Sequence, residues 1–233
     1  MVKKFDTKFA LGIFLILVMI SFTGCQIKDE ENLSIESKIT EEIDYIENKM
    51  LVFLNMYAKN EYGDKGNLNW DLIKENAIEL NGVLDTIILD MSEVEISNED
   101  IINFKNTINR LSIAASNEDI ETVLEEYRSL YSLLPIYAQK SYENKNKLNL
   151  LELKSLVVSS YVYANNLDWD NAKKTIGDAE TKYKTMMDDV DYMKEYSYNL
   201  NKVYVLLSEL KNALDIEEVE LIKVKYVNFI EKI

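Results

Sequence analysis

The sequence predicts an all-α protein, because turn residues are scarce and apolar residues recur at helical spacing. Beyond residue 32 there is one proline, Pro135, and there are four glycines, whereas a β-sheet protein needs many turns built from these residues. Apolar residues follow one another every three or four positions, as they do on one face of a helix. We therefore expect an antiparallel helical bundle or stacked helix pairs with about eight helices.

The first three expected helices have clear apolar stripes or starts. A stripe of apolar residues at steps of three and four covers residues 35–57. Asn69 is placed to cap a second helix that continues to Met91, and Ser97 is placed to cap a third that continues to Ala115. These starts predict three helices joined by short connections.

The middle of the chain predicts a break between two helices. Ser116 repeats the Ser-Asn-Glu-Asp-Ile start found at Ser97, so we expect it to cap a fourth helix. Pro135 should break or kink that helix, because proline has no N–H to donate and clashes with the preceding turn. A long helix is then expected from about Ile136 to Ala164.

Three further helices complete the prediction. Asp168 should cap the first of them, which continues to Val190. The second carries apolar positions from Tyr196 to Leu214, and Asp215 should cap the last.

A short motif suggests that the chain holds two similar halves. Residues 68–71 (Leu-Asn-Trp-Asp) recur as residues 167–170 (Leu-Asp-Trp-Asp), 99 positions later. With this offset the apolar positions of three helices stay in register without a gap, although the match weakens upstream. An internal duplication into halves 34–134 and 135–233 would explain the agreement, but helical periodicity alone also produces such matches. Both interpretations stay open.

Residues 1–24 have the composition of an export signal. Three lysines in the first eight residues precede an apolar run over residues 9–20, and small residues follow it. The apolar run is shorter than the roughly 20 residues that a membrane span needs. We therefore expect a signal peptide that is removed.

The residues at the end of this segment resemble the lipobox of bacterial lipoproteins. Thr23-Gly24-Cys25 carries the resemblance, with Phe22 where the family usually has Leu. It implies cleavage between Gly24 and Cys25 and a diacylglyceryl thioether on Cys25, and two acyl chains hold a protein on a membrane stably. Residues 25–33 would then be a tether and residues 34–233 a helical domain on the extracytoplasmic face.

The chain as a whole is similar to uncharacterised helical lipoproteins of low-GC Gram-positive bacteria. The similarity rests on the lipobox and on the general helical character of the sequence. It implies a cell-envelope location and supplies no activity.

Composition excludes several classes of function. The formal net charge is −15 and becomes −17 once residues 1–24 are removed, so the surface repels nucleic acid and anionic lipid. The absence of histidine rules out Ser-His-Asp and Cys-His catalysis and the usual histidine metal ligands. Cys25 is the only cysteine, so no disulfide is expected. We identify no catalytic set, no metal site and no cofactor.

Two Trp-Asp pairs are the most distinctive candidates for a ligand or partner contact. Trp70 is followed by an aspartate, and Trp169 lies between Asp168 and Asp170. A tryptophan beside carboxylates can hold a sugar or a cation. The same residues are also what a helix start requires, which is the interpretation that we favour.

Acidic clusters and tyrosines offer weaker candidates. The acids at 41–44 and 188–191 lack the spacing and the turn glycine of a calcium loop, so solvated helix faces explain them better. Pairs of tyrosines at helical spacing, such as Tyr192 and Tyr196, can line a groove but more often form the edge of a core.

Three hypotheses for function follow from these patterns. The first is a non-enzymatic, lipid-anchored helical protein that binds an envelope protein partner through a helix face or groove. The second is a lipoprotein that binds a solute or cation for a transporter, which requires carboxylates converging on one pocket. The third is an enzyme that uses carboxylates alone, and it needs two acids facing each other across a cleft.

Overall fold

The computed structural model describes residues 35–63, 67–94, 96–141, 145–188 and 190–233 of the chain, which form one compact body from Ile35 to Ile233. Every regular element among these residues is a helix, so the all-α prediction is confirmed. The helices are α2 (Ile35–Ala58), α3 (Trp70–Gly82), α4 (Leu84–Glu93), α5 (Asn98–Ser116), α6 (Ile120–Ser141), α7 (Lys145–Asn165), α8 (Trp169–Asp188), α9 (Val190–Ile216) and α10 (Val219–Lys232). The predicted signal peptide, the tether and Cys25 lie outside the described residues.

The prediction of one helix from Asn69 to Met91 is wrong, because the chain forms two helices there. α3 ends at Gly82 and α4 begins at Leu84, with Val83 between them. Glycine is among the poorest helix formers, which makes Gly82 a favourable place for a helix to end. The predicted cap is confirmed, since the side chain of Asn69 accepts a hydrogen bond from the backbone N–H of Leu72.

Pro135 does not end its helix, which contradicts the prediction of a break. α6 continues through Pro135 to Ser141, and the next helix begins at Lys145 rather than near Ile136. Proline removes the N–H that would bond the carbonyl of Tyr131 four residues earlier. The surrounding residues of α6 are buried, so their packing offsets this local cost. α6 thus crosses the boundary expected between residues 134 and 135.

Two predicted caps belong instead to the ends of the preceding helices. Ser116 is the last residue of α5, and α9 includes Asp215 and ends at Ile216. Glu118 and Glu217 follow these helix ends with left-handed φ angles of 59° and 60°, the usual conformation after a helix C-terminus. The side chain of Asp119 caps α6 by accepting a hydrogen bond from the N–H of Thr122.

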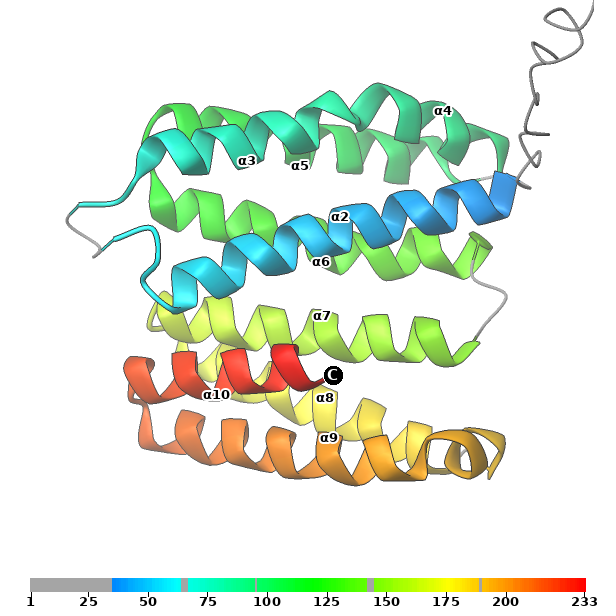
Figure 1. Ribbon diagram of the computed structural model, residues 1–233, viewed down its shortest axis with the longest axis vertical. Coiled ribbons are helices and arrows are strands. Elements are labelled where there is room, and N and C mark those ends of the chain that lie inside the picture. The colour runs from blue at the N-terminus through cyan, green and yellow to red at the C-terminus, as the bar shows by residue number, and fades with distance from the viewer. Residues whose placement is uncertain (1–34, 64–66, 95, 142–144, 189) are drawn as a thin grey trace, which may run out of the picture. The chain divides into compact units, whose positions relative to one another are not determined.

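The helices form two sets that have the same order of contacts. In the first, α2 packs on α3 and α4, these pack on α5, α5 packs on α6, and α6 returns to α2. In the second, α7 packs on α8, α8 on α9, α9 on α10, and α10 returns to α7. The sets meet where α6 contacts α7 and α2 contacts α10, and Figure 1 shows them one above the other.

An aromatic stack occupies a corresponding place in each set. Phe53 of α2 stacks on Tyr127 of α6 with ring centroids 4.0 Å apart, and Tyr161 of α7 stacks on Tyr226 of α10 at 4.1 Å. The two tyrosines that α6 and α10 contribute are 99 residues apart, as the repeated motif requires, whereas Phe53 and Tyr161 are 108 apart. The connection 59–69 is longer than the connection 166–168, so the upstream helices match only when a gap is allowed.

Ion pairs recur at the same offset of 99 residues. Lys74 pairs with Glu118 at 2.8 Å, and Lys173 pairs with Glu217 at 2.6 Å. A third pair, Arg110–Glu126, corresponds to Glu209–Lys225 with the two charges exchanged between the helices. These correspondences are what an internal duplication predicts, and duplication stays a prediction.

Because the sets share two helix contacts, we expect them to unfold together. Trp70 reports on the first set and Trp169 on the second, so Trp70→Phe and Trp169→Phe each leave one fluorescent reporter. Tyr226→Ala, which removes the second aromatic stack, should cost about 3–5 kcal/mol and lower the urea midpoint of both reporters equally. Separate midpoints, with only the Trp169 signal shifted, would show that the sets are independent folding units.

Candidate functional site

The outer face of α3, α4 and α5 carries exposed large apolar side chains. Five of them are between 37 and 68% exposed: Leu72, Ile78, Leu89, Ile102 and Ile113. Single exposed apolar residues are normal on any protein, but several on adjoining helices form a patch that marks an interaction surface.

Two contacts fix how α3 and α4 lie beside α5. Lys74 reaches Glu118 just beyond the end of α5, and the side-chain amide of Asn81 donates to the hydroxyl of Ser112 at 3.2 Å. The earlier residue of α3 thus contacts the later residue of the α5 segment, and the later residue of α3 contacts the earlier one. The two helices therefore run antiparallel. Ile78 therefore lies near the C-terminal part of α5, and Leu89 lies near its N-terminal part.

The five matching positions of the second set hold polar residues or glycine, although α9 exposes Tyr204 and Val205 at other positions. At the offset of 99, the five apolar residues correspond to Asn171, Gly177, Asp188, Asn201 and Asn212. The second set forms the same ring of helices without apolar side chains at these positions, so the fold does not require them. The sequence already contained the difference between these five apolar residues and their counterparts 99 positions later. Only the structure shows that the five apolar residues are exposed.

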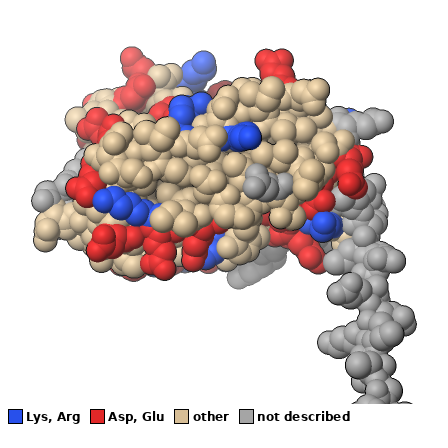
Figure 2. All heavy atoms as spheres, turned by 90° about the horizontal axis from the view of Figure 1, so that it is seen from above, with Lys and Arg blue, Asp and Glu red and all other residues tan. Residues whose placement is uncertain are grey.

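The surface over α3, α4 and α5 is largely uncharged in its middle. Figure 2 looks down on this side and shows mostly uncharged atoms, with acidic side chains gathered at the edges and a few basic ones nearer the middle. Asp71 and Glu75 lie one turn apart on the exposed side of α3, one turn before Ile78. The exposed apolar side chains therefore have acidic residues around them and a few basic ones among them.

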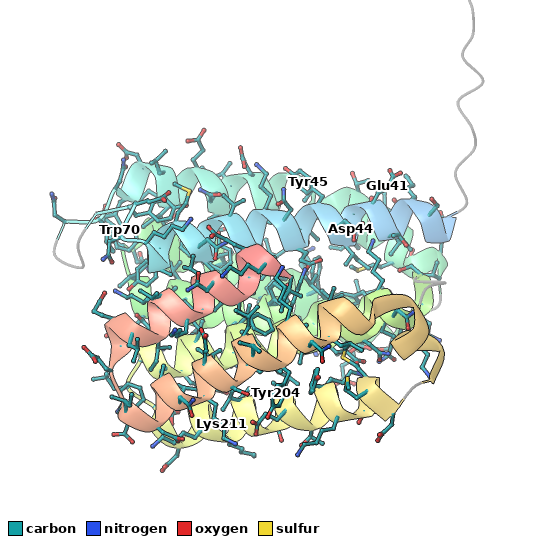
Figure 3. The ribbon with its side chains drawn as sticks, turned by 60° about the horizontal axis from the view of Figure 1, so that its bottom comes forward. Glu41, Asp44, Tyr45, Trp70, Tyr204 and Lys211 are labelled. Atoms are coloured by element: carbon teal, nitrogen blue, oxygen red, sulfur yellow. The ribbon has the colours of Figure 1, made fainter. Side chains whose placement is uncertain are left out.

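A hollow of about 370 Å³ lies beside this face, between α2 and the junction of α3 with α4. Its lining includes Glu41, Glu42 and Tyr45 from α2 together with Val83 and Thr86 from the other side. Figure 3 shows Glu41 and Tyr45 on one side of α2 and Asp44 on the other. Asp44 points elsewhere, pairing with Lys147 of α7, so the predicted cluster at residues 41–44 is divided between two surfaces.

One carboxyl group in the lining of this hollow, that of Glu42, meets a buried aspartate of α4. Glu42 hydrogen bonds to Asp90 of α4, which is only 6% exposed and is paired with Lys38 at 2.9 Å. Burial, and the hydrogen bond that the protonated Glu42 donates to Asp90, raise the pKa of Glu42 to about 7, although Lys38 opposes the shift. Two carboxylates cannot hydrogen bond without a proton, so Glu42 carries one at neutral pH for part of the time.

Lys223 forms a buried polar link between the two sets of helices. Its side chain is 5% exposed, and its ammonium donates to Asn60 at 3.2 Å and to Glu220 at 2.7 Å. A hollow of about 310 Å³ adjoins these groups between the end of α2 and α10. Lys223 has hydrogen-bond partners on both sets, so we assign it a structural role.

The four residues of the predicted Trp-Asp contact lie at helix starts. Asp168 accepts hydrogen bonds from the backbone N–H of Asn171 at 3.3 Å and from its side-chain amide at 2.7 Å. Trp70 and Trp169 begin α3 and α8 and pack half-buried against the core, while Asp170 is exposed. Each residue therefore does what a helix start requires, and the two tryptophans belong to different sets.

The remaining candidates do not form a site among the residues described. The side chains of Asp189, Asp191, Tyr192 and Tyr196 lie outside the described part. Tyr161 is buried in its stack, so it does not line a groove. Within the described residues, no three Asp, Glu, Cys or His side chains converge to hold a metal ion.

None of the described helices is both long enough and apolar enough to cross a membrane. Comparisons with known proteins identify no relative, since no family model, curated protein or solved structure matches the chain significantly. The function of the exposed apolar face and of the adjoining hollow is therefore inferred from their chemistry.

The Glu42–Asp90 pair should make stability depend on pH near neutrality. The pKa of Glu42 is higher in the folded protein, about 7, than its ordinary value of 4.5. The folded state thus binds more protons than the unfolded state between these values, so the free energy of unfolding falls as pH rises through this range. Below pH 4.5 Glu42 is largely protonated in both states, so this penalty, the loss of stability from ionising Glu42, is absent.

Glu42→Gln should remove the penalty, because an amide cannot ionise and can donate to Asp90. We expect the variant to be more stable than wild type by about 1 kcal/mol at pH 8, after allowing for solvent screening of this partly exposed group, and no more stable at pH 4.5. Urea unfolding at both pH values measures the difference. Glu41→Gln is the matched control, and an equal gain there would contradict the role of the pair.

Proposed function

We propose that the protein is a non-enzymatic binding module that is anchored to the outer face of the cell membrane through Cys25. It engages an envelope protein through the outer face of α3, α4 and α5. The observation that carries the proposal is the set of exposed apolar side chains on this face, since the second set of helices builds the same arrangement with polar residues there. Exposed apolar side chains that this arrangement of helices does not require are expected of a docking face.

The absence of histidine and of any recognisable catalytic set supports a role in binding rather than in catalysis. The acidic surface supports attachment to the membrane through acyl chains rather than through a basic patch. The Lys-rich start, the apolar run and Thr23-Gly24-Cys25 support export and lipidation.

Lipid anchoring is tested by changing the modified residue. Cys25→Ala should abolish incorporation of labelled palmitate and release the protein from the membrane fraction, because no other residue offers the thiol that the acyl group needs. Cys25→Ser is a closer match in size and should behave in the same way. Membrane retention of both variants would show that another segment holds the protein.

The docking face is tested by site-specific photocross-linking on intact cells. A photoreactive residue in place of Asn106, which lies between Ile102 and Ile113 on α5, should form one dominant adduct with an envelope protein. Combining it with Leu89→Asp, Ile102→Asn and Ile113→Asn, which introduce the residues of the second set, should reduce this adduct by roughly tenfold or more.

The matched probe replaces Val205, the counterpart of Asn106 in the second set, and should give no such adduct. Melting curves of all variants should agree within a few degrees, because the changes are on the surface. Equal adducts from both positions, or an adduct that survives the three substitutions, would show that this face is not the docking surface.

The hollow between α2 and α4 supports a second candidate function, the binding of a small cationic solute. Its lining offers two carboxyl groups and one aromatic ring, and its lysine, Lys38, is already paired with Asp90, so the hollow suits an organic ammonium group better than a metal ion. A bound cation would favour the ionised form of Glu42, so binding near pH 7 should release a proton.

Calorimetry with spermidine in buffers of different ionisation enthalpy tests this candidate. Heat that depends on the buffer with wild type, and not with Glu42→Gln, would support the site. No binding, or equal heats for the two proteins, would exclude it.

A further inference from the structure

We infer that the partner of the face formed by α3, α4 and α5 is a protein segment with an apolar stripe flanked by lysine or arginine side chains. The inference rests on the proposed function and names the chemistry of the partner. It follows from the difference in charge between the two sets of helices and from the position of the acids around the apolar side chains.

The two sets carry different numbers of basic residues on otherwise comparable helices. The sequences of α3, α4 and α5 contain eight acidic and three basic residues, whereas those of α8 and α9 contain eight acidic and seven basic residues. The basic residues that balance the acids of α8 and α9 are thus largely missing from α3, α4 and α5. A partner that covers this face must therefore tolerate, and would benefit from, uncompensated negative charge.

Most of the few basic side chains on this face are already paired. Lys74 is engaged by Glu118, and Arg110 holds Glu126 with hydrogen bonds of 2.6 and 2.9 Å. By contrast, Asp71 and Glu75 are exposed on the same side of α3 as Ile78. Acids beside an apolar centre resemble the polar rim around the dry core of a protein interface, and the complementary rim is basic.

The same charges argue against the two other occupants of an apolar face. A second copy of this chain would place like acids against one another, in molecules that each carry a net charge of −15. An anionic lipid surface would be repelled for the same reason. A cationic amphipathic segment satisfies both the apolar centre and its acidic surroundings.

The test uses two synthetic helical peptides of equal length with the same leucine stripe, one with lysine and one with glutamate on the polar face. The protein is the body from residue 25 onwards with Cys25→Ala, which keeps the compact unit intact. The lysine peptide should bind at least tenfold more tightly than the glutamate peptide, and added salt should weaken its binding.

Matched variants separate specific docking from general attraction to an acidic protein. Asp71→Asn with Glu75→Gln should weaken binding of the lysine peptide by roughly 3- to 10-fold. Asp170→Asn with Asp178→Asn removes the same charge from α8 and should leave binding unchanged. Ile102→Asn with Ile113→Asn should abolish binding, whereas Val205→Asn with Val224→Asn should not.

Several results would overturn the inference. Equal loss in both pairs of charge variants would mean unspecific attraction. Binding of the glutamate peptide would mean that charge does not select the partner. Sedimentation showing a dimer that Ile102→Asn dissociates, or flotation with phosphatidylglycerol vesicles that the same change abolishes, would identify a second copy or a lipid surface as the occupant.

Failure of the inference can be told apart from failure of the proposed function. If neither peptide binds while the photoreactive residue at position 106 still captures an envelope protein, the docking face stands and the cationic class of partner is wrong. If the adduct is also absent, the docking face itself is wrong.

Discussion

In each set of helices, the fold depends on the first helix packing against the last around a stacked pair of aromatic rings. The pairs of helices are α2 with α6 and α7 with α10. In each set a helix at the start and a helix at the end close the ring, and the stacked rings of Phe53 with Tyr127 and of Tyr161 with Tyr226 lie fully buried between them. Large aromatic side chains bury more apolar area than aliphatic ones, so each stack stabilises contact between the segments of its set that are farthest apart in sequence.

Because the first and last helices close each ring, the side chains on the outward faces of the middle helices can change without loss of the fold. In the second set the five matching positions hold polar residues or glycine, although Tyr204 and Val205 of α9 are exposed. In the first set they carry exposed isoleucine and leucine beside acids. Similar frameworks can thus carry different surface side chains, so a surface can gain a function while the fold is kept.

The hollow beside this face has a different origin. It forms where α3 and α4 meet at Val83, so that the chain there follows two short helices in place of one. Lys38 and Glu42 of its lining meet the buried Asp90 because α2 packs against α4. Because the pKa of Glu42 is raised to about 7, we expect this group of charges to respond to pH near neutrality.

The sequence by itself determined the helical class, the helix starts at Asn69, Ser97 and Asp168, and the expectation of a lipid anchor on Cys25, which stays a prediction. These features are local, since a cap needs only residues within one turn of it. Tertiary structure alone decided that Pro135 lies inside a helix, that Glu42 meets Asp90 across 48 positions, and which apolar residues remain exposed. Those outcomes depend on burial between distant segments, and burial can outweigh local preference without leaving a mark in the nearby sequence.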